Sequence, residues 1–205
     1  MRIAFFASGN GSTFQALVEA INNEKLSVTP ALLICSNSKA RVIERAKNLS
    51  VPSSVVSRKE YLTTTEHAEA LLAALSVSSC DFICLCGYTE LVPPQVVASF
   101  RNRILNIHPA LLPAFGGKGM YGHRVHEAVI AYGARISGAT VHVVDEEYDH
   151  GPIIAQQAVL VYPNDSPESL AERVQLVEKS LYVAALRLFA RDKIHIENRK
   201  VTILP

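Results

Sequence analysis

The chain has 205 residues, 49% of them hydrophobic and 19% charged, and its formal net charge is +1 at neutral pH. This length suits one α/β domain with a substantial core. The small net charge argues against a general attraction to nucleic acid or to a membrane surface. No apolar run approaches the roughly 20 residues of a membrane span. We therefore expect small-molecule partners, with neither nucleic acid nor membrane among them.

The chain has four cysteines, at Cys35, Cys80, Cys84 and Cys86. We expect buried, reduced thiols, because a zinc site would need more Cys or His at ligand spacing nearby. The apolar start is short and runs at once into Asn10-Gly11-Ser12, which fits a first strand better than a signal peptide. Reduced thiols without a signal predict a cytoplasmic protein.

Strand and helix signals alternate through the first half of the chain. Strands are expected at residues 3–7, 31–35, 54–56, 81–86 and 104–108. Helices are expected at residues 13–22, 40–49, 65–75 and 93–100. This alternation predicts a doubly wound, mostly parallel sheet with helices on both faces, a Rossmann-like arrangement.

The pattern changes after His108. A loop at 109–121, a short helix at 125–132 and strands at 140–144 and 153–161 are expected, the strands adding an antiparallel part to the sheet. A long helix follows, capped by Ser166, with an apolar stripe of Leu170, Val174, Val177, Leu181 and Leu188. The tail predicts a hairpin around Asn198-Arg199. We expect a single domain over residues 1–205, with halves at 1–108 and 109–205.

The segment Ser8-Gly9-Asn10-Gly11-Ser12 joins the first strand to the first helix. Glycines let backbone N–H groups face a ligand, and a helix N-terminus favours an anion. A dinucleotide fingerprint is incomplete because position 14 is Phe, and the Gly-Lys-Ser/Thr of a mononucleotide P-loop is absent. The segment therefore fits a single phosphate, with an ordinary capped turn as the alternative.

Asn106-Ile107-His108-Pro109 ends a buried strand. Side chains alternate along a strand, so the amide of Asn106 and the imidazole of His108 share a face. Polar groups at the carboxyl end of a strand lie where open α/β sheets bind ligands. The alternative is a histidine satisfied within the core beside a turn-forming asparagine.

Asp149 is the expected partner of His108. It closes an acidic loop, residues 145–149, that precedes His150-Gly151-Pro152. If this carboxylate folds back onto His108, we expect it to favour the imidazolium and to raise the pKa of His108, supplying an acid near pH 7. A solvated surface turn is the alternative.

Two further segments carry weaker signals. The glycine-rich stretch 116–122 could form a lid, with Lys118 attracting an anion, or could simply be a mobile loop. Gln175 and Glu178 are neighbours on the long helix, where a solvated helix face is the ordinary reading.

Together these segments resemble the phosphoribosylglycinamide formyltransferases, folate-dependent enzymes of purine biosynthesis. The resemblance spans nearly the whole chain, and four segments carry it: RIAFFASGNGS (2–12), LNIHPALLP (105–113), VHVVDEEYDHGPIIAQ (141–156) and RVQLVE (173–178). It implies direct formyl transfer from 10-formyltetrahydrofolate to the amine of phosphoribosylglycinamide, in a monomer or homodimer, without a metal.

The resemblance also implies roles for individual residues. The catalytic set is Asn106, His108 and Asp149. The substrate-binding residues are Gly11, Ser12, Thr13, Gln175, Leu176, Val177 and Glu178. The folate-binding residues are Arg58, Thr89, Glu90, Leu91, Val92, Asn106, Asp145, Glu146, Glu147, Tyr148 and Asp149.

The chain departs from the family pattern at three places. Thr13 stands where Asn is common, Thr89-Glu90 stands where Met-Arg is common, and the stretch 116–125 is longer than usual. The alternatives are another folate-dependent formyltransferase acting on an amino-sugar nucleotide or on methionyl-tRNA, a formyltetrahydrofolate hydrolase, or a non-catalytic module that binds phosphate ligands.

Overall fold

The computed structural model describes residues 1–205, and the chain forms two compact units, Met1–Leu105 and Asn106–Pro205. The division falls within strand β5 (Ile104–His108), which begins in the first unit and ends in the second. None of the helices combines the length and the apolar character that a membrane crossing requires.

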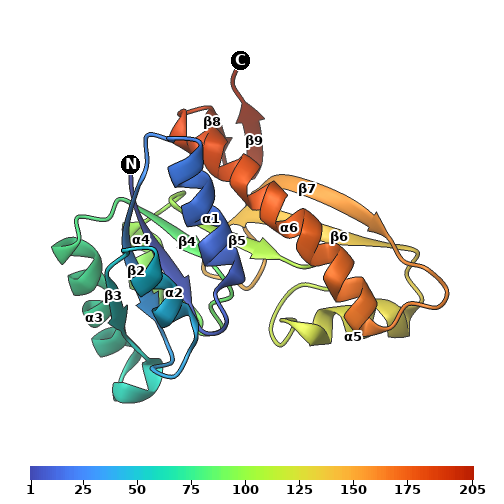
Figure 1. Ribbon diagram of the computed structural model, residues 1–205, viewed down its shortest axis with the longest axis horizontal. Helices are drawn as coiled ribbons and strands as arrows, with labels where there is room; N and C mark the ends of the chain where they lie inside the picture. Colours follow the sequence, from blue (N-terminus) through green and yellow to red (C-terminus); the bar gives the residue numbers. More distant parts are fainter. The chain divides into compact units, whose positions relative to one another are not determined.

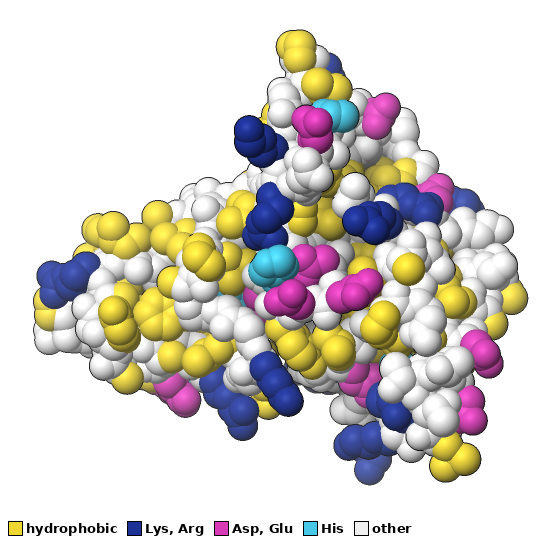
Figure 2. All heavy atoms as spheres, turned by 180° about the vertical axis from the view of Figure 1, so that it is seen from behind, with side chains coloured by type: hydrophobic (Ala, Val, Ile, Leu, Met, Phe, Trp, Pro, Cys, Tyr) yellow, Lys and Arg dark blue, Asp and Glu magenta, His cyan; other side chains and the backbone are white.

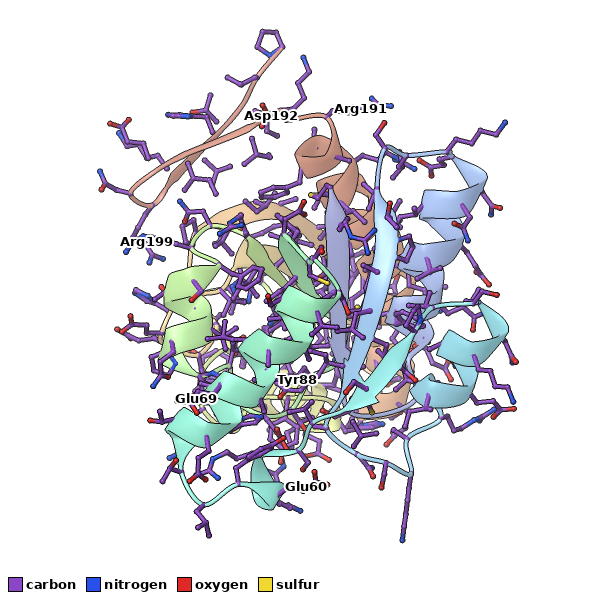
Figure 3. The ribbon with its side chains drawn as sticks, turned by 90° about the vertical axis from the view of Figure 1, so that its left-hand side faces the viewer. Glu60, Glu69, Tyr88, Arg191, Asp192 and Arg199 are labelled. Carbon is purple, nitrogen blue, oxygen red and sulfur yellow. The ribbon has the colours of Figure 1, made fainter.

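The first unit is built on parallel strands. They are β1 (Arg2–Ala7), β2 (Thr29–Cys35), β3 (Ser53–Val55) and β4 (Phe82–Leu85), in the order β3-β2-β1-β4, with the start of β5 beside β4. The helical elements are α1 (Ser12–Asn23), α2 (Val42–Asn48), the 3-10 turn η1 (Arg58–Glu60), α3 (Thr64–Val77) and α4 (Pro94–Ser99). The pair α1 and α2 and the pair α3 and α4 cover opposite faces of the strands (Figure 3).

The central position of β1 follows from its composition. Ile3 to Ala7 are all completely buried, as expected of a parallel strand covered on both faces. The predicted apolar face of α1 is also confirmed, because Phe14, Leu17, Val18 and Ile21 are all buried. The first unit therefore carries the expected doubly wound pattern.

The second unit contains the end of β5, helix α5 (His123–Tyr132), strands β6 (Ile136–Val143) and β7 (Ile153–Leu160), helix α6 (Pro167–Ala190), and the hairpin of β8 (Ile194–Glu197) and β9 (Lys200–Ile203). Strands β6 and β7 pair antiparallel, with an irregularity between Val141 and His142. Helix α6 packs against both strands and beside α5 (Figure 1). The predicted fold class, mostly parallel α/β with antiparallel strands in the C-terminal half, is confirmed.

The structure corrects several details. Strand β6 begins at Ile136, four residues before the expected start at 140, because Ser137 and Gly138 weaken the strand signal in the sequence. On α6, Leu170, Val174 and Leu181 are buried as expected, but Val177 and Leu188 are only partly buried, and Tyr182, Ala185 and Leu186 complete the core face. The hairpin around Asn198-Arg199 is confirmed.

The thiols follow the expectation with one exception. None of the four cysteines forms a disulfide, and Cys35, Cys84 and Cys86 are buried, whereas Cys80 is partly exposed. Cys80 lies in the turn between α3 and β4, where no element covers it on every side.

Candidate active site

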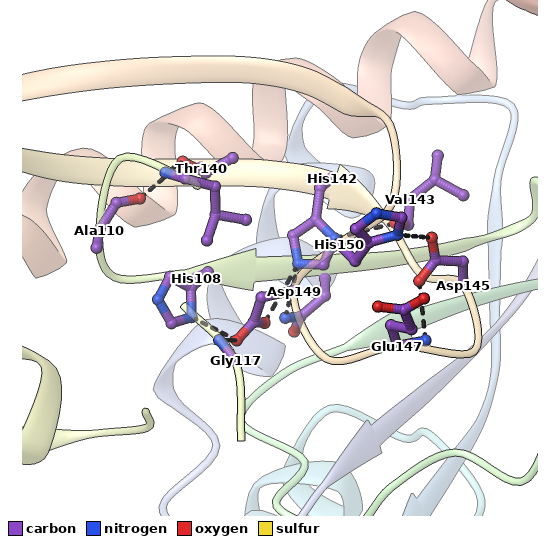
Figure 4. Close-up of polar contacts among 12 residues, drawn as sticks. His108, Ala110, Gly117, Thr140, His142, Val143, Asp145, Glu147, Asp149 and His150 are labelled. Carbon is purple, nitrogen blue, oxygen red and sulfur yellow. Dashed lines mark hydrogen bonds and ion pairs between the residues drawn. The ribbon is translucent and has the colours of Figure 1, made fainter. Parts of the chain in front are cut away.

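Asp149 lies against the histidine at the end of β5, as expected from the sequence. Its Oδ2 is 3.4 Å from His108 Nδ1, and the two side chains are only 11% and 3% exposed (Figure 4). Asp149 adopts a positive φ of 54°, a conformation that an aspartate tolerates better than most side chains. This backbone turn ends the acidic loop with its carboxylate against His108.

His108 is held from both sides of its ring. Its Nε2 donates a hydrogen bond to the carbonyl of Phe115 at 2.8 Å, while Nδ1 faces Asp149. Burial lowers the pKa of His108 below 6.5 and outweighs the opposing charge of Asp149 and the bond to Phe115. The expected rise in the pKa of His108 is therefore wrong, because the cost of burying the imidazolium exceeds the attraction of one carboxylate.

His142 joins Asn106 to this pair. Its Nδ1 donates to the Val143 carbonyl at 2.9 Å, so in the neutral ring Nε2 accepts from the Asn106 amide at 3.1 Å. The same Nε2 is 3.6 Å from Asp149 Oδ1. His142 is not among the residues expected from the sequence, although its place in an alternating strand just before the acidic loop is a signal for it.

Asp149 also fixes the loop that follows β5. Its Oδ2 accepts the N–H of Gly117 at 3.0 Å. Burial raises the pKa of Asp149, but the contact with His142, the charge that His108 carries when protonated and the Gly117 N–H together hold it below its usual value. Gly116 lies close to this carboxylate, since a Cβ there would be 2.5 Å from Leu112 Cδ2 and 3.2 Å from Asp149 Cβ, and a side chain would require Leu112 to move.

Thr140 holds the chain as it leaves β5. Its hydroxyl donates to the Ala110 carbonyl at 2.7 Å and accepts from the Leu112 N–H at 3.0 Å. The Gln156 amide donates both to Thr140 Oγ1 and to the Leu112 carbonyl. These bonds explain why the turn after His108 is tied to β6 and β7, and they assign a structural role to Gln156.

The acidic loop is fastened at its exposed end. Asp145 Oδ2 lies 2.7 Å from His150 Nδ1, and the Arg199 guanidinium donates to the His150 carbonyl at 2.6 Å. Figure 2 shows acidic side chains gathered beside a histidine on this face, with basic side chains next to them. Gly151 closes the loop, because a Cβ there would overlap the Val143 carbonyl oxygen at 1.9 Å.

The predicted phosphate loop lies in the first unit. Gly11 is the N-cap of α1 with φ 78°, and a Cβ there would meet Val42 Cγ2 at 2.4 Å. Ser12 and Thr13 open the helix, where N–H groups lack an intrahelical acceptor. The Arg45 guanidinium donates to the Asn10 carbonyl at 2.8 Å and so anchors the loop. This geometry is compatible with the predicted anion site.

The predicted folate segments of the first unit are joined to each other. The carboxylate of Glu90 accepts the main-chain N–H of Arg58 at 3.1 Å. The guanidinium of Arg58 donates to the Tyr61 carbonyl at 2.6 Å. Leu91 is 45% exposed, whereas Val92 is buried.

The four predicted residues on α6 differ in exposure. Gln175 and Leu176 are exposed, whereas Val177 and Glu178 are partly buried. Burial raises the pKa of Glu178 to about 7. A solvated helix face therefore does not describe Glu178. No group of three or more His, Cys, Asp or Glu side chains is arranged to hold a metal ion.

The mostly parallel α/β fold is the one that the resemblance to formyltransferases implied, and comparison with known proteins confirms it. The formyl transferase family model matches residues 1–186, and the chain belongs to this family.

The relatives within the family are more specific. The chain is 36% identical to a Bacillus subtilis phosphoribosylglycinamide formyltransferase over 91% of this chain and 93% of that protein. It is 42% identical to the chloroplastic Arabidopsis thaliana enzyme of the same name, over 94% of this chain. Glycinamide ribonucleotide transformylase 1 from Symbiobacterium toebii superposes with a TM-score of 0.94 at 36% identity, over 100% of this chain and 94% of that one. The chain spans 66% of the Arabidopsis protein's length.

Proposed function

We propose that this chain transfers the formyl group of 10-formyltetrahydrofolate to the amine of 5'-phosphoribosylglycinamide, a step of purine biosynthesis. The observation that carries the proposal is the contact of Asp149 with His108 beside Asn106 at the end of β5. The similarity to enzymes named for this reaction supports the choice of substrate.

The reaction needs hydrogen-bond donors from the protein, and it needs no nucleophile from the protein. The substrate amine attacks the formyl carbon, negative charge develops on the formyl oxygen, and the bond to the folate nitrogen then breaks. The amine loses a proton and the folate nitrogen gains one. The Asn106 amide has two hydrogens, one engaged by His142, so the second can donate to the oxyanion. One such donor is typically worth about 3 kcal/mol of barrier.

His108 is proposed as the second donor, through Nε2. To donate to the oxyanion, this N–H must leave the Phe115 carbonyl that it contacts at 2.8 Å. Asp149 lies at the opposite edge of the ring, where it can accept the Nδ1–H only of the protonated ring and so favours that form. We assign to the loop 115–119, which contains Gly117 and Gly119 at positive φ, the displacement that this exchange requires.

Binding roles are assigned by residue. Gly11, Ser12 and Thr13 bind the substrate phosphate, and the segment from Gln175 to Glu178 binds the rest of the ribonucleotide. Arg58, the segment from Thr89 to Val92 and the acidic loop from Asp145 to Asp149 bind the folate. The pKa of Glu178 near 7 suits a carboxyl that can donate or accept hydrogen bonds to sugar hydroxyls. We also propose that the protein is cytoplasmic, that it needs no metal ion, and that it is a monomer or a homodimer.

A spectrophotometric assay of folate product with synthetic phosphoribosylglycinamide tests the proposal. Product is expected only when both substrates are present. Formylation of an amino-sugar nucleotide but not of phosphoribosylglycinamide would overturn the substrate assignment. Release of formate without an acceptor amine would indicate a hydrolase instead.

The catalytic assignment has its own test. His108→Ala and Asp149→Asn are each expected to lower kcat by about 10²–10³ while the Kd for the phosphate substrate changes little. His195→Ala and Asp192→Asn are matched controls, since both residues are exposed on the C-terminal segment. Unchanged turnover in either site variant would remove the mechanism.

A further inference from the structure

Glu90 is the centre of a hydrogen-bond network in the first unit. Its carboxylate accepts the Arg58 N–H through both oxygens, at 3.2 and 3.1 Å. It also accepts from the Ser57 hydroxyl at 3.3 Å and from the Tyr88 hydroxyl at 3.1 Å. Bonds to a charged acceptor are stronger than neutral ones. One side chain therefore ties the loop after β4 to the start of η1.

The network is shielded from water. The side chain of Glu90 is 18% exposed, and His67, which is 1% exposed, places Nε2 3.7 Å from it. Burial and the charge of Glu90 raise the pKa of Tyr88, so its hydroxyl keeps the proton that it donates. Burial lowers the pKa of His67 although Glu90 opposes the shift, and neither ring nitrogen of His67 has a hydrogen-bond partner. The charge of Glu90 is therefore balanced by hydrogen bonds rather than by a buried cation.

The loop after β4 has a second attachment. The N–H of Thr89 donates to the Ser8 hydroxyl at 3.0 Å, and the Ser8 hydroxyl also bonds the Ser36 hydroxyl at 2.6 Å. The main-chain N–H of Thr89 and the side chain of Glu90 thus both bond to other parts of the protein. A carboxylate with three donors already around it has little capacity left for a ligand.

We propose that Glu90 is a positioning residue for the folate. It fixes the main chain of Arg58 and the 88–92 loop relative to each other, and this inference rests on the proposed function, which assigns both segments to the folate. It also accounts for an acid at a position where the family commonly carries an arginine. The carboxylate acts on backbone N–H groups of the protein, so it need not approach the anionic tail of the folate.

Steady-state kinetics of Glu90→Ala and Glu90→Gln test the role. Glu90→Ala is expected to raise KM for 10-formyltetrahydrofolate about tenfold, the loss of one or two charge-assisted bonds, with kcat and KM for phosphoribosylglycinamide within about twofold. Glu90→Gln is expected to lie between Ala and wild type, because its amide oxygen still accepts the Arg58 N–H. Glu69→Gln, an exposed charge change on α3, is the matched control (Figure 3).

A second measurement does not depend on activity. Hydrogen exchange of the Arg58 amide is expected to be faster in Glu90→Ala than in wild type or Glu69→Gln. If Glu90→Ala does not fold, Tyr88→Phe, which removes one donor, is expected to raise the same KM by a smaller factor.

The two proposals fail separately. A wild-type protein that cannot use phosphoribosylglycinamide overturns the proposed function and this inference with it. An active wild-type protein whose Glu90→Ala variant keeps its KM for folate, or loses kcat instead, overturns the inference alone.

Discussion

At the scale of single residues, His142 is the least expected member of the site. Its Nε2 accepts one N–H of the Asn106 amide and lies 3.6 Å from Asp149 Oδ1, so it determines which N–H remains for the proposed oxyanion contact. His142→Ala is expected to lower kcat about tenfold, the worth of one or two neutral hydrogen bonds, without changing either KM by a similar factor. His142→Gln, which keeps an acceptor, is expected to recover part of kcat. Steady-state kinetics decide, and equal activity of all three proteins would contradict the role.

The pKa of His108 gives a second prediction at this scale. Because burial holds this pKa below 6.5, the ring is expected to be neutral at pH 7 and to gain its proton only on acidification below pH 6.5. The charge of Asp149 opposes the shift, so Asp149→Asn is expected to move the titration to still lower pH. NMR titration of the His108 ring in the two proteins measures this directly. A titration midpoint above 6.5 in the wild-type protein would contradict the prediction.

Sequence reasoning reached some of these residues and not others, for physical reasons. Strand alternation was enough to place Asn106 and His108 on one face, and the contact with Asp149 followed from the acidic loop that Asp149 ends. The direction of the His108 pKa could not be obtained in the same way. It depends on how deeply the ring is buried, and tertiary packing sets that burial, which a strand pattern does not show.

At the scale of secondary structure, the β8–β9 hairpin carries a bond that matters beyond its own stability. Arg199 in its turn donates to the carbonyl of His150, the residue directly after Asp149. Arg199→Ala is expected to speed hydrogen exchange in residues 145–150 and to lower kcat a few-fold, while the melting temperature changes little because the contact is exposed.

Lys200→Ala, a neighbouring charge change on β9, is the control for Arg199→Ala. Exchange that is equal in the wild-type protein and both variants would show that the hairpin does not order the acidic loop. Figure 3 marks Arg199 at the tip of the hairpin.

Helices and strands were predictable where the residue composition and the spacing of apolar residues indicated the same structure. The bounds of β5 were predicted from an apolar run stopped by Pro109, and Ser166 was recognised as the cap of α6. The start of β6 was not predictable, because the residues that extend it are small and its pairing with β7 decides their conformation. The core face of α6 was misjudged towards its C-terminal end, since only packing shows that Tyr182 and Leu186 complete it.

At the scale of the whole molecule, the thiols report on folding. Burial raises the pKa of Cys35 and Cys86, and it raises the pKa of Cys80 to about 11. Few thiolates are therefore expected from these three groups at pH 8 in the folded protein. A thiol reagent such as Ellman's is expected to react slowly with the native chain and rapidly with all four groups in denaturant. Rapid native reaction at more than one cysteine would contradict this picture.

The boundary between the two units could not be predicted from the sequence. The sequence changes character at His108, and the expected halves met there. The structure divides between Leu105 and Asn106, three residues earlier and within β5. That the chain acts as a single domain stays a prediction. Local composition does not show that one strand is shared by two units. The fold class needed only the rhythm of the elements and was predicted correctly.

The bond from His108 to the Phe115 carbonyl has a consequence for inhibitors. With His108 as the proposed oxyanion donor, a compound that mimics the oxyanion would have to replace this carbonyl as the acceptor of the Nε2 proton. Rearrangement of the glycine-containing segment would then govern how quickly such a compound reaches its tightest complex. Progress curves with a tetrahedral analogue are expected to show slow-onset inhibition. An analogue without the charged oxygen is expected to reach full inhibition without a lag.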